Sequence, residues 1–165
     1  MSASAPGDEA IGRLAALDVC TPVAGRVLAM VEVPDPLFAA AMVGPGLAVD
    51  PMRAPGTAVS PIAGSIAKLH PHAFVVVAGD GRGVLVHLGI DTVQLKGAGF
   101  ELVAQKGDAV EPGTPVVRWN PVDVEAGGRS PICPVVALEA SSDAVSDPQA
   151  VGSWLTAGER LFTWT

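Results

Sequence analysis

The sequence contains an internal repeat of a short turn-and-strand motif. The segment Thr21-Pro22-Val23-Ala24-Gly25-Arg26-Val27 matches Ser60-Pro61-Ile62-Ala63-Gly64-Ser65-Ile66 at an offset of 39 residues, and Ser130-Pro131-Ile132 is a weaker match. Proline suits the first position of a strand because it cannot donate to a ladder, and glycine permits a bend or bulge. A solenoid needs roughly three or more repeats. The repeat therefore predicts two similar β-units packed into one sandwich or barrel.

Glycine and proline punctuate the whole chain, which has 19 glycines, 15 prolines, no tyrosine and 4% aromatic residues among its 165 residues. Such a composition favours short strands joined by tight turns over long helices. We predict an all-β fold, an antiparallel β-sandwich or barrel with a few short helical turns, as a single domain over residues 18–165 after a flexible leader at 1–17. Strands are expected at 19–20, 25–31, 57–59, 64–69, 73–78, 84–89, 101–104, 115–118, 132–138 and 161–164, and helical turns near 36–42, 121–127 and 147–155.

Charge and hydropathy exclude several function classes. The net charge of −7 argues against nucleic acid, because phosphate backbones are bound by clustered Lys and Arg. The longest uncharged stretches, 36–49 and 54–67, are broken by Gly and Pro and fall short of the roughly 20 apolar residues of a membrane span. Cys20 and Cys133 lie in no CxxC pattern, which gives little support for a zinc or redox framework. We expect a cytoplasmic protein without stable membrane insertion.

The segment His72 to Asp91, HAFVVVAGDGRGVLVHLGID, predicts a β-hairpin. Asp80-Gly81 is typical of a two-residue type I′ turn. In that register His72 lies opposite Gly89 and His87 opposite Phe74, so the two histidines are diagonal neighbours with Cβ atoms about 7 Å apart. The face of His87 would also carry Leu85, Phe74 and Val76, and the opposite face, with Val84, Val86 and Leu88, would form the core.

Two imidazoles on one apolar face can transfer a phosphoryl group. A neutral imidazole is nucleophilic near pH 7 because its unperturbed pKa is about 6.5, and it can hold the group as a labile N–P bond. A second imidazole can donate an N–H to the phosphoryl oxygens, while apolar surroundings exclude water. On these residues alone, a phosphoryl-transfer site and a structural histidine pair remain alternatives.

The hairpin and its flanks resemble a known family. Residues 86–100, VHLGIDTVQLKGAGF, closely resemble the phosphorylation-site signature of the glucose-type IIA proteins of the bacterial phosphoenolpyruvate-dependent sugar phosphotransferase system. Further similar blocks follow the family's order over residues 18–165, and they are 33–38, 42–48, 72–74, 107–110 and 133–136.

The resemblance implies an antiparallel β-sandwich of the duplicated hybrid motif type and a phosphocarrier role. Phosphorylated HPr would transfer its phosphoryl group to Nε2 of His87. From there the group would pass to a cysteine on the IIB domain of a membrane sugar permease of the glucose or N-acetylglucosamine class. His72 would be the companion histidine for onward transfer, and Asp91 either a residue of the site's rim or only a turn residue. The apolar docking patch implied by the resemblance consists of Phe38, Val43, Leu47, Phe74 and Leu85. Regulatory binding by the unphosphorylated form is a second function common in the family.

Departures and rival functions remain open at this level. Leu69-His70-Pro71 stands where many relatives carry a hydroxyl residue that holds the companion imidazole, so His70 competes for that role. A biotinyl or lipoyl carrier needs an exposed lysine at a hairpin tip, a setting that Lys68, Lys96 and Lys106 lack. A zinc hydrolase needs a third ligand beside His72 and His87, and the sequence offers no clear one. No cofactor is expected to be required, although these two histidines could share an accessory zinc ion with a partner.

Overall fold

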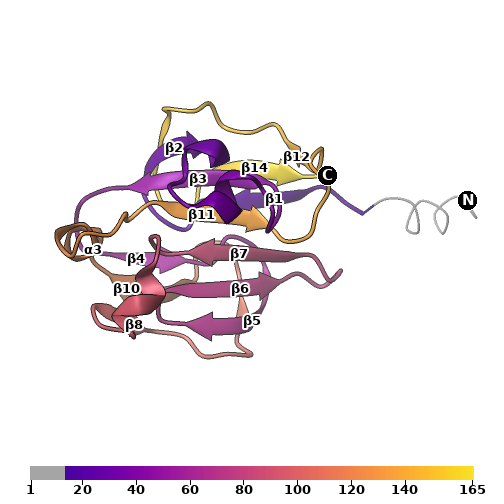
Figure 1. Ribbon diagram of the computed structural model, residues 1–165. Helices are drawn as coiled ribbons and strands as arrows, with labels where there is room; N and C mark the ends of the chain where they lie inside the picture. Colours follow the sequence, from indigo (N-terminus) through magenta and orange to yellow (C-terminus); the bar gives the residue numbers. More distant parts are fainter. Residues whose placement is uncertain (1–13) are drawn as a thin grey trace, which may run out of the picture.

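The computed structural model describes residues 14–165, which form three antiparallel sheets (Figure 1). The largest has eight strands in the order β13-β2-β3-β11-β7-β6-β5-β9, and the other two are β1-β14-β12 and β4-β10-β8. The predicted antiparallel β-sandwich is thus confirmed. In the described part of the chain, no helix is long and apolar enough to cross a membrane.

The elements are short. The strands are β1 (Leu17–Cys20), β2 (Gly25–Ala29), β3 (Gly46–Pro51), β4 (Gly56–Val59), β5 (Gly64–His70), β6 (Ala73–Val77), β7 (Gly83–His87), β8 (Phe100–Leu102), β9 (Ala109–Val110), β10 (Pro115–Trp119), β11 (Cys133–Ala137), β12 (Val145–Ser146), β13 (Trp154–Leu155) and β14 (Arg160–Trp164). The helical segments are η1 (Met30–Glu32), α2 (Pro36–Ala39), η2 (Thr92–Leu95) and α3 (Pro121–Ala126).

The two copies of the sequence repeat exchange hydrogen bonds with each other. The amide of Cys20 donates to the carbonyl of Pro61 at 2.9 Å, and the amide of Val59 donates to the carbonyl of Pro22 at 2.9 Å. Each copy therefore satisfies a backbone donor at the end of the other copy's strand, as two units related by duplication would do. The strand β11, which pairs with β3 on one side and β7 on the other, joins the two units into the eight-stranded sheet.

The repeated glycines are needed for close approach between strands. A Cβ on Gly25 would lie 2.2 Å from the carbonyl oxygen of Asp50, and a Cβ on Gly64 would lie 2.2 Å from that of Val77. Both distances are far below van der Waals contact, so only glycine fits at the start of β2 and of β5. The predicted duplication of the β-unit is visible at these equivalent positions.

Two clusters of buried side chains fill the interior. The larger one includes Phe74, Val76, Val84, Val86 and Leu88 and extends through both units. The smaller one lies under the connection between β2 and β3, and its buried members are Met30, Val33, Phe38, Ala48, Ile90 and Val136. The smaller cluster supports the segments that carry the candidate site.

Several sequence predictions of elements were wrong or incomplete. Strands β3, β9, β12 and β13 were not predicted, and the expected helical turn at 147–155 is absent. The amide of Gln149 donates to the carbonyl of Leu161 at 2.9 Å, so this part of the segment lies against β14. Gly152, with a φ of +93°, then turns the chain into β13. The predicted leader at 1–17 falls mainly on residues 1–13, which lie outside the described residues, and β1 begins at Leu17.

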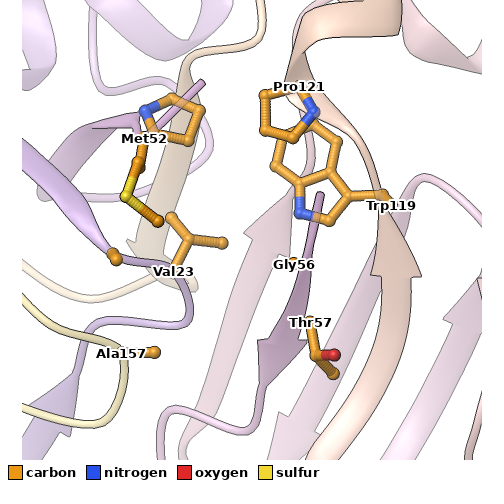
Figure 2. Close-up of a pocket in the computed structure, with 9 residues that line it drawn as sticks. Val23, Met52, Gly56, Thr57, Trp119, Pro121 and Ala157 are labelled. Atoms are coloured by element: carbon orange, nitrogen blue, oxygen red, sulfur yellow. The ribbon is translucent and has the colours of Figure 1, made fainter. Parts of the chain in front are cut away.

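An apolar pocket of about 160 Å³ lies between the two units (Figure 2). Val23 and Met52 face Gly56, Thr57 and Trp119 across it. None of its lining residues is a histidine, an acid or a base. It is therefore separate from the candidate chemistry described next.

Candidate active site

Three imidazoles and one phenyl ring lie together where β7 ends beside the connection between β5 and β6. The ring centroids of His72 and His87 are 5.3 Å apart, with the rings at 68° in an edge arrangement. Phe38 of α2 contacts His87 with the centroids 5.4 Å apart. His70 stacks on His72 with the centroids 5.8 Å apart and the rings at 29°. The structure thus brings together the two histidines that the sequence singled out.

The hairpin that presents them has a different register from the predicted one. Ala73 pairs with His87 and Phe74 with Val86, and the amide of Ala78 donates to the carbonyl of Arg82 at 2.8 Å. The loop therefore holds three residues, 79–81, with Gly81 at a φ of +93°, which is a common three-residue hairpin. The predicted two-residue turn is wrong by one residue.

The register change moves side chains to the other face. Phe74 and Val76 are 1% and 0% exposed and belong to the core, so the prediction that they share the face of His87 is wrong. His72 reaches His87 because it lies in the turn before β6, where strand alternation no longer applies. The two rings meet, but not as diagonal neighbours within the ladder.

The Nδ1 atom of His87 is held by a backbone carbonyl. It lies 2.5 Å from the oxygen of Gly89. A carbonyl can only accept, so in the neutral ring Nδ1 carries the proton and Nε2 keeps its lone pair. Gly89 has a φ of +83°, and a Cβ there would lie 2.7 Å from Cγ2 of Thr92 and 3.0 Å from the carbonyl oxygen of Ser130. The buried Thr92 hydroxyl donates to the carbonyl of Leu88 at 2.8 Å, which holds the turn in place.

Both imidazoles of the pair are neutral near pH 7. Burial lowers the pKa of His87, and the carbonyl of Gly89 and the charges of Asp35 and Asp91 oppose that shift. Burial, followed by the proximity of His87 and His70, lowers the pKa of His72 to about 4. A neutral His87 has a free lone pair for attack on phosphorus, and a neutral His72 retains one N–H to donate.

The charges of two acidic residues act on the His87 ring. One is Asp91, which lies in the left-handed region with a φ of +60°, precedes η2 and is exposed; this placement fits both a rim residue and a turn residue. Asp35, the N-cap of α2, accepts from the amide of Leu37 at 2.9 Å and also acts on His87. Asp35 was not predicted as a site residue, although it lies in the block 33–38 that resembles the family.

The predicted docking patch is only partly on the surface. Phe38 and Leu47 are buried, at 9% and 8% exposed, and Val43 and Leu85 are half-buried. Phe74 lies in the core, so the prediction that it belongs to a docking patch is wrong. Leu37 and Met42, on either side of Phe38 in the sequence, and Val93 in η2 are exposed apolar side chains. Sequence analysis missed these three because a pattern of apolar residues does not tell which of them face solvent.

The histidine pair could supply part of a metal site. Among residues 14–165 no group of three or more His, Cys, Asp or Glu side chains is arranged to hold a metal ion. His72 and His87 could furnish two of the four ligands that zinc usually takes. A zinc ion bound there would have no third protein ligand among residues 14–165.

Comparison with known proteins agrees with this geometry. Residues 17–142 match the family model of the phosphoenolpyruvate-dependent sugar phosphotransferase system, EIIA 1. The chain belongs to this EIIA family. The resemblance to glucose-type IIA proteins is thereby confirmed, and phosphotransfer in sugar uptake is the role of such EIIA components.

Two curated relatives and one solved structure extend the match. The chain is 38% identical over 138 residues to the PTS system glucose-specific EIIA component of Staphylococcus aureus strain MSSA476, covering 81% of this chain and 82% of the relative. It is 34% identical over 140 residues to the component of that name in Staphylococcus epidermidis strain ATCC 12228, covering 82% and 83%. Glucose permease IIA from Mycoplasma capricolum has the same fold, with a TM-score of 0.82 at 26% identity, covering 91% of this chain and 96% of that one.

Proposed function

We propose that this EIIA component accepts a phosphoryl group from phosphorylated HPr on Nε2 of His87 and passes it to a cysteine on the IIB domain of a sugar permease. The observation that carries the proposal is the Nδ1 contact of His87 with the carbonyl of Gly89. It leaves Nε2 unprotonated in the neutral ring, so the nucleophile needs no separate base to take up a proton.

In the acceptance step the lone pair of Nε2 attacks phosphorus. The new N–P bond forms as the bond between phosphorus and HPr breaks, and the electron pair of that bond stays with HPr. The imidazole becomes electron-poor, and the carbonyl of Gly89 stabilises it through the Nδ1–H contact. Phe38, edge-on to His87, excludes water that would hydrolyse the phosphohistidine.

In the delivery step the thiolate of the IIB cysteine attacks phosphorus and the N–P bond of His87 breaks. Its electron pair returns to Nε2. His72 lies edge-on to His87 and donates its N–H to the phosphoryl oxygens as charge shifts toward the acceptor. Its low pKa keeps His72 neutral, so it stabilises the group without holding it as tightly as a cation would.

Docking combines apolar contact with charge. Leu37, Met42 and Val93 are 55%, 72% and 58% exposed, and they offer an apolar surface on the two segments beside His87. The charges of Asp35 and Asp91 act at the same ring and would repel the phosphoryl group itself. We therefore expect each partner to present apolar side chains ringed by cationic ones.

The partners define the setting. HPr and IIB domains act in the cytoplasm, and we place this chain there with them, serving a permease of the glucose or N-acetylglucosamine class. The same docking surface could bind regulatory partners in the unphosphorylated form. A zinc ion shared between His72, His87 and such a partner would compete with phosphorylation because it would occupy the imidazole nitrogens.

The proposal is tested by phosphorylation with phosphoenolpyruvate, enzyme I and HPr. We expect one acid-labile, base-stable phosphate per chain, absent in His87→Gln and present in His72→Gln. Phosphorus NMR should assign the signal to an Nε2 phosphohistidine. No incorporation into the unmodified protein, or undiminished incorporation into His87→Gln, contradicts the assignment.

A further inference from the structure

The ring of His72 lacks the anchor that His87 has. Its backbone carbonyl accepts from the amide of Leu88 at 2.7 Å, but its imidazole makes no hydrogen bond to another residue within 14–165. The ring lies between two other imidazoles: the centroid of His87 is 5.3 Å away with the rings at 68°, and that of His70 is 5.8 Å away with the rings near-parallel at 29°. Its orientation therefore depends on packing.

His70 is presented from a rigid part of the hairpin. It is the last residue of β5 and pairs with Ala73. Pro71 follows, which fixes its own φ and restricts His70 to an extended backbone. The ring of Pro71 is covered from the loop after η2, because a Cβ on Gly97 would lie 3.4 Å from its Cγ. The spacing between the two imidazoles is therefore set by a short, supported turn.

We infer that His70 is a positioning residue that stacks on His72 and holds its imidazole toward His87. The inference rests on the proposed phosphocarrier function and assigns the role of His70 within it. His70 does not replace His72 as companion, because the ring that contacts His87 is that of His72. The stack fixes the ring where a donated N–H can meet the phosphoryl group.

The expected effect is modest and confined to delivery. Aromatic pairs contribute enough to shift a conformational equilibrium by about threefold to tenfold. Without the stack, a smaller fraction of molecules holds His72 in the competent orientation, and the apparent rate falls by that fraction. The rate of phosphoryl acceptance depends on Nε2 of His87, which Gly89 orients. Loss of the His70 stack should therefore change this rate by less than about twofold.

The test compares three variants of the full chain. His70→Ala removes the stack, His70→Phe restores a flat ring at the same place, and Lys68→Ala removes an exposed side chain two residues earlier on β5. We expect phosphoryl delivery to IIB to fall by about threefold to tenfold in His70→Ala and to recover in His70→Phe, with Lys68→Ala unchanged. Delivery at the unmodified rate in His70→Ala, or no recovery in His70→Phe, overturns the inference.

Two further readouts separate stacking from charge and from the proposed function. His70 and His87 face His72, while Asp35 and Asp91 act on His87. Both His70 variants remove the same imidazole and its electrostatic effect on His72, so recovery in His70→Phe alone identifies the stack. Ring-to-ring NMR contacts between His72 and His87 should weaken in His70→Ala only. The NMR measurement needs no phosphoryl transfer, so it tests the stack independently of the carrier function. Failure of the carrier function would appear instead as the absence of label in the unmodified protein.

Discussion

The Nδ1 atom of His87 lies 2.5 Å from the carbonyl oxygen of Gly89, two residues further along the chain. This contact decides which ring nitrogen is free, and it is made possible by a left-handed turn.

Replacing Gly89 by Ala should lower stability and slow phosphoryl acceptance. The new Cβ would meet Cγ2 of Thr92 at 2.7 Å and the carbonyl oxygen of Ser130 at 3.0 Å, so the carbonyl that orients His87 must move. We expect a loss of roughly 2–4 kcal/mol and at least a tenfold lower acceptance rate. Urea unfolding and labelling from phosphorylated HPr measure the two effects. Gly99→Ala is the matched control, because Gly99 has a φ of +87° but open space around it. Equal effects in both variants would show that only backbone strain matters.

His72→Gln should separate acceptance from delivery. The amide can donate a hydrogen bond, but it lacks the edge contact that places the imidazole beside His87, so its N–H is not preorganised toward the phosphoryl group. We expect phosphate uptake within about twofold of the unmodified protein and delivery to IIB at least roughly tenfold slower. The loss of one preorganised donor typically slows a reaction by more than this. Rapid mixing with a purified IIB domain measures delivery. Unimpaired delivery would remove His72 from the mechanism.

Acidification should destabilise the protein through its neutral histidines. In the unfolded chain an imidazole takes up a proton near pH 6.5, whereas the folded state lowers the pKa of His72 to about 4. The unfolded state binds more protons between these values, so the stability from this group is complete above about pH 6.5 and falls as the pH drops toward about 4. Urea midpoints at pH 7 and pH 5 measure the loss, which should be smaller in His72→Gln. An equal loss in that variant would assign the pH dependence to other groups.

Polar substitution of the exposed apolar residues should weaken docking without altering the chemistry. Met42→Ser combined with Val93→Ser removes exposed apolar surface from the segments that follow Phe38 and Gly89, since these side chains are 72% and 58% exposed. We expect KM for phosphorylated HPr to rise roughly fivefold to tenfold with kcat unchanged. Val151→Ser, which alters an exposed apolar residue next to β13 at the far edge of the large sheet, should leave KM as it was. A fall in kcat alone would place Met42 and Val93 in the reaction rather than in docking.

Gly64→Ala should be among the more damaging single substitutions in the scaffold. Its Cβ would overlap the carbonyl oxygen of Val77 at 2.2 Å, forcing β5 and β6 apart at the base of the hairpin that ends in His70 and His72. We expect a loss of roughly 2–4 kcal/mol. Gly79→Ala, in the hairpin loop with nothing within 4 Å, provides the comparison in thermal and urea unfolding. A small effect in Gly64→Ala would mean that the strand shifts easily.

Sequence reasoning succeeded where a local pattern determines the structure. The repeated Pro-x-Ala-Gly motifs predicted two related β-units, and the alternation of Val84, Val86 and Leu88 predicted the core face of β7. The prediction failed for the partner strand β6. Gly79 joins Asp80 and Gly81 in the loop, and a register shift of one residue moves every side chain of the strand to the opposite face of the sheet. Strand β3 was missed because two prolines and two glycines flank its apolar run.

The site was predictable only in part. The predicted hairpin and the resemblance to the family identified both histidines, but the stack of His70 and the influence of Asp35 depend on tertiary packing. Phe38 contacts His87, but the burial of Phe38 and Leu47 could not be read from hydropathy, which does not distinguish a side chain under the surface from one upon it.

The duplicated units differ in the length of the connection that follows β2 in one unit and β5 in the other. Between β2 and β3 it spans residues 30–45, whereas between β5 and β6 it has only residues 71 and 72. The long connection brings Phe38 to the ring of His87, and the short one presents His72. The phenyl ring that covers His87 and the two histidines thus come from different copies of the β-unit. Exchanging the two connections between the copies would be a direct way to remove that cover.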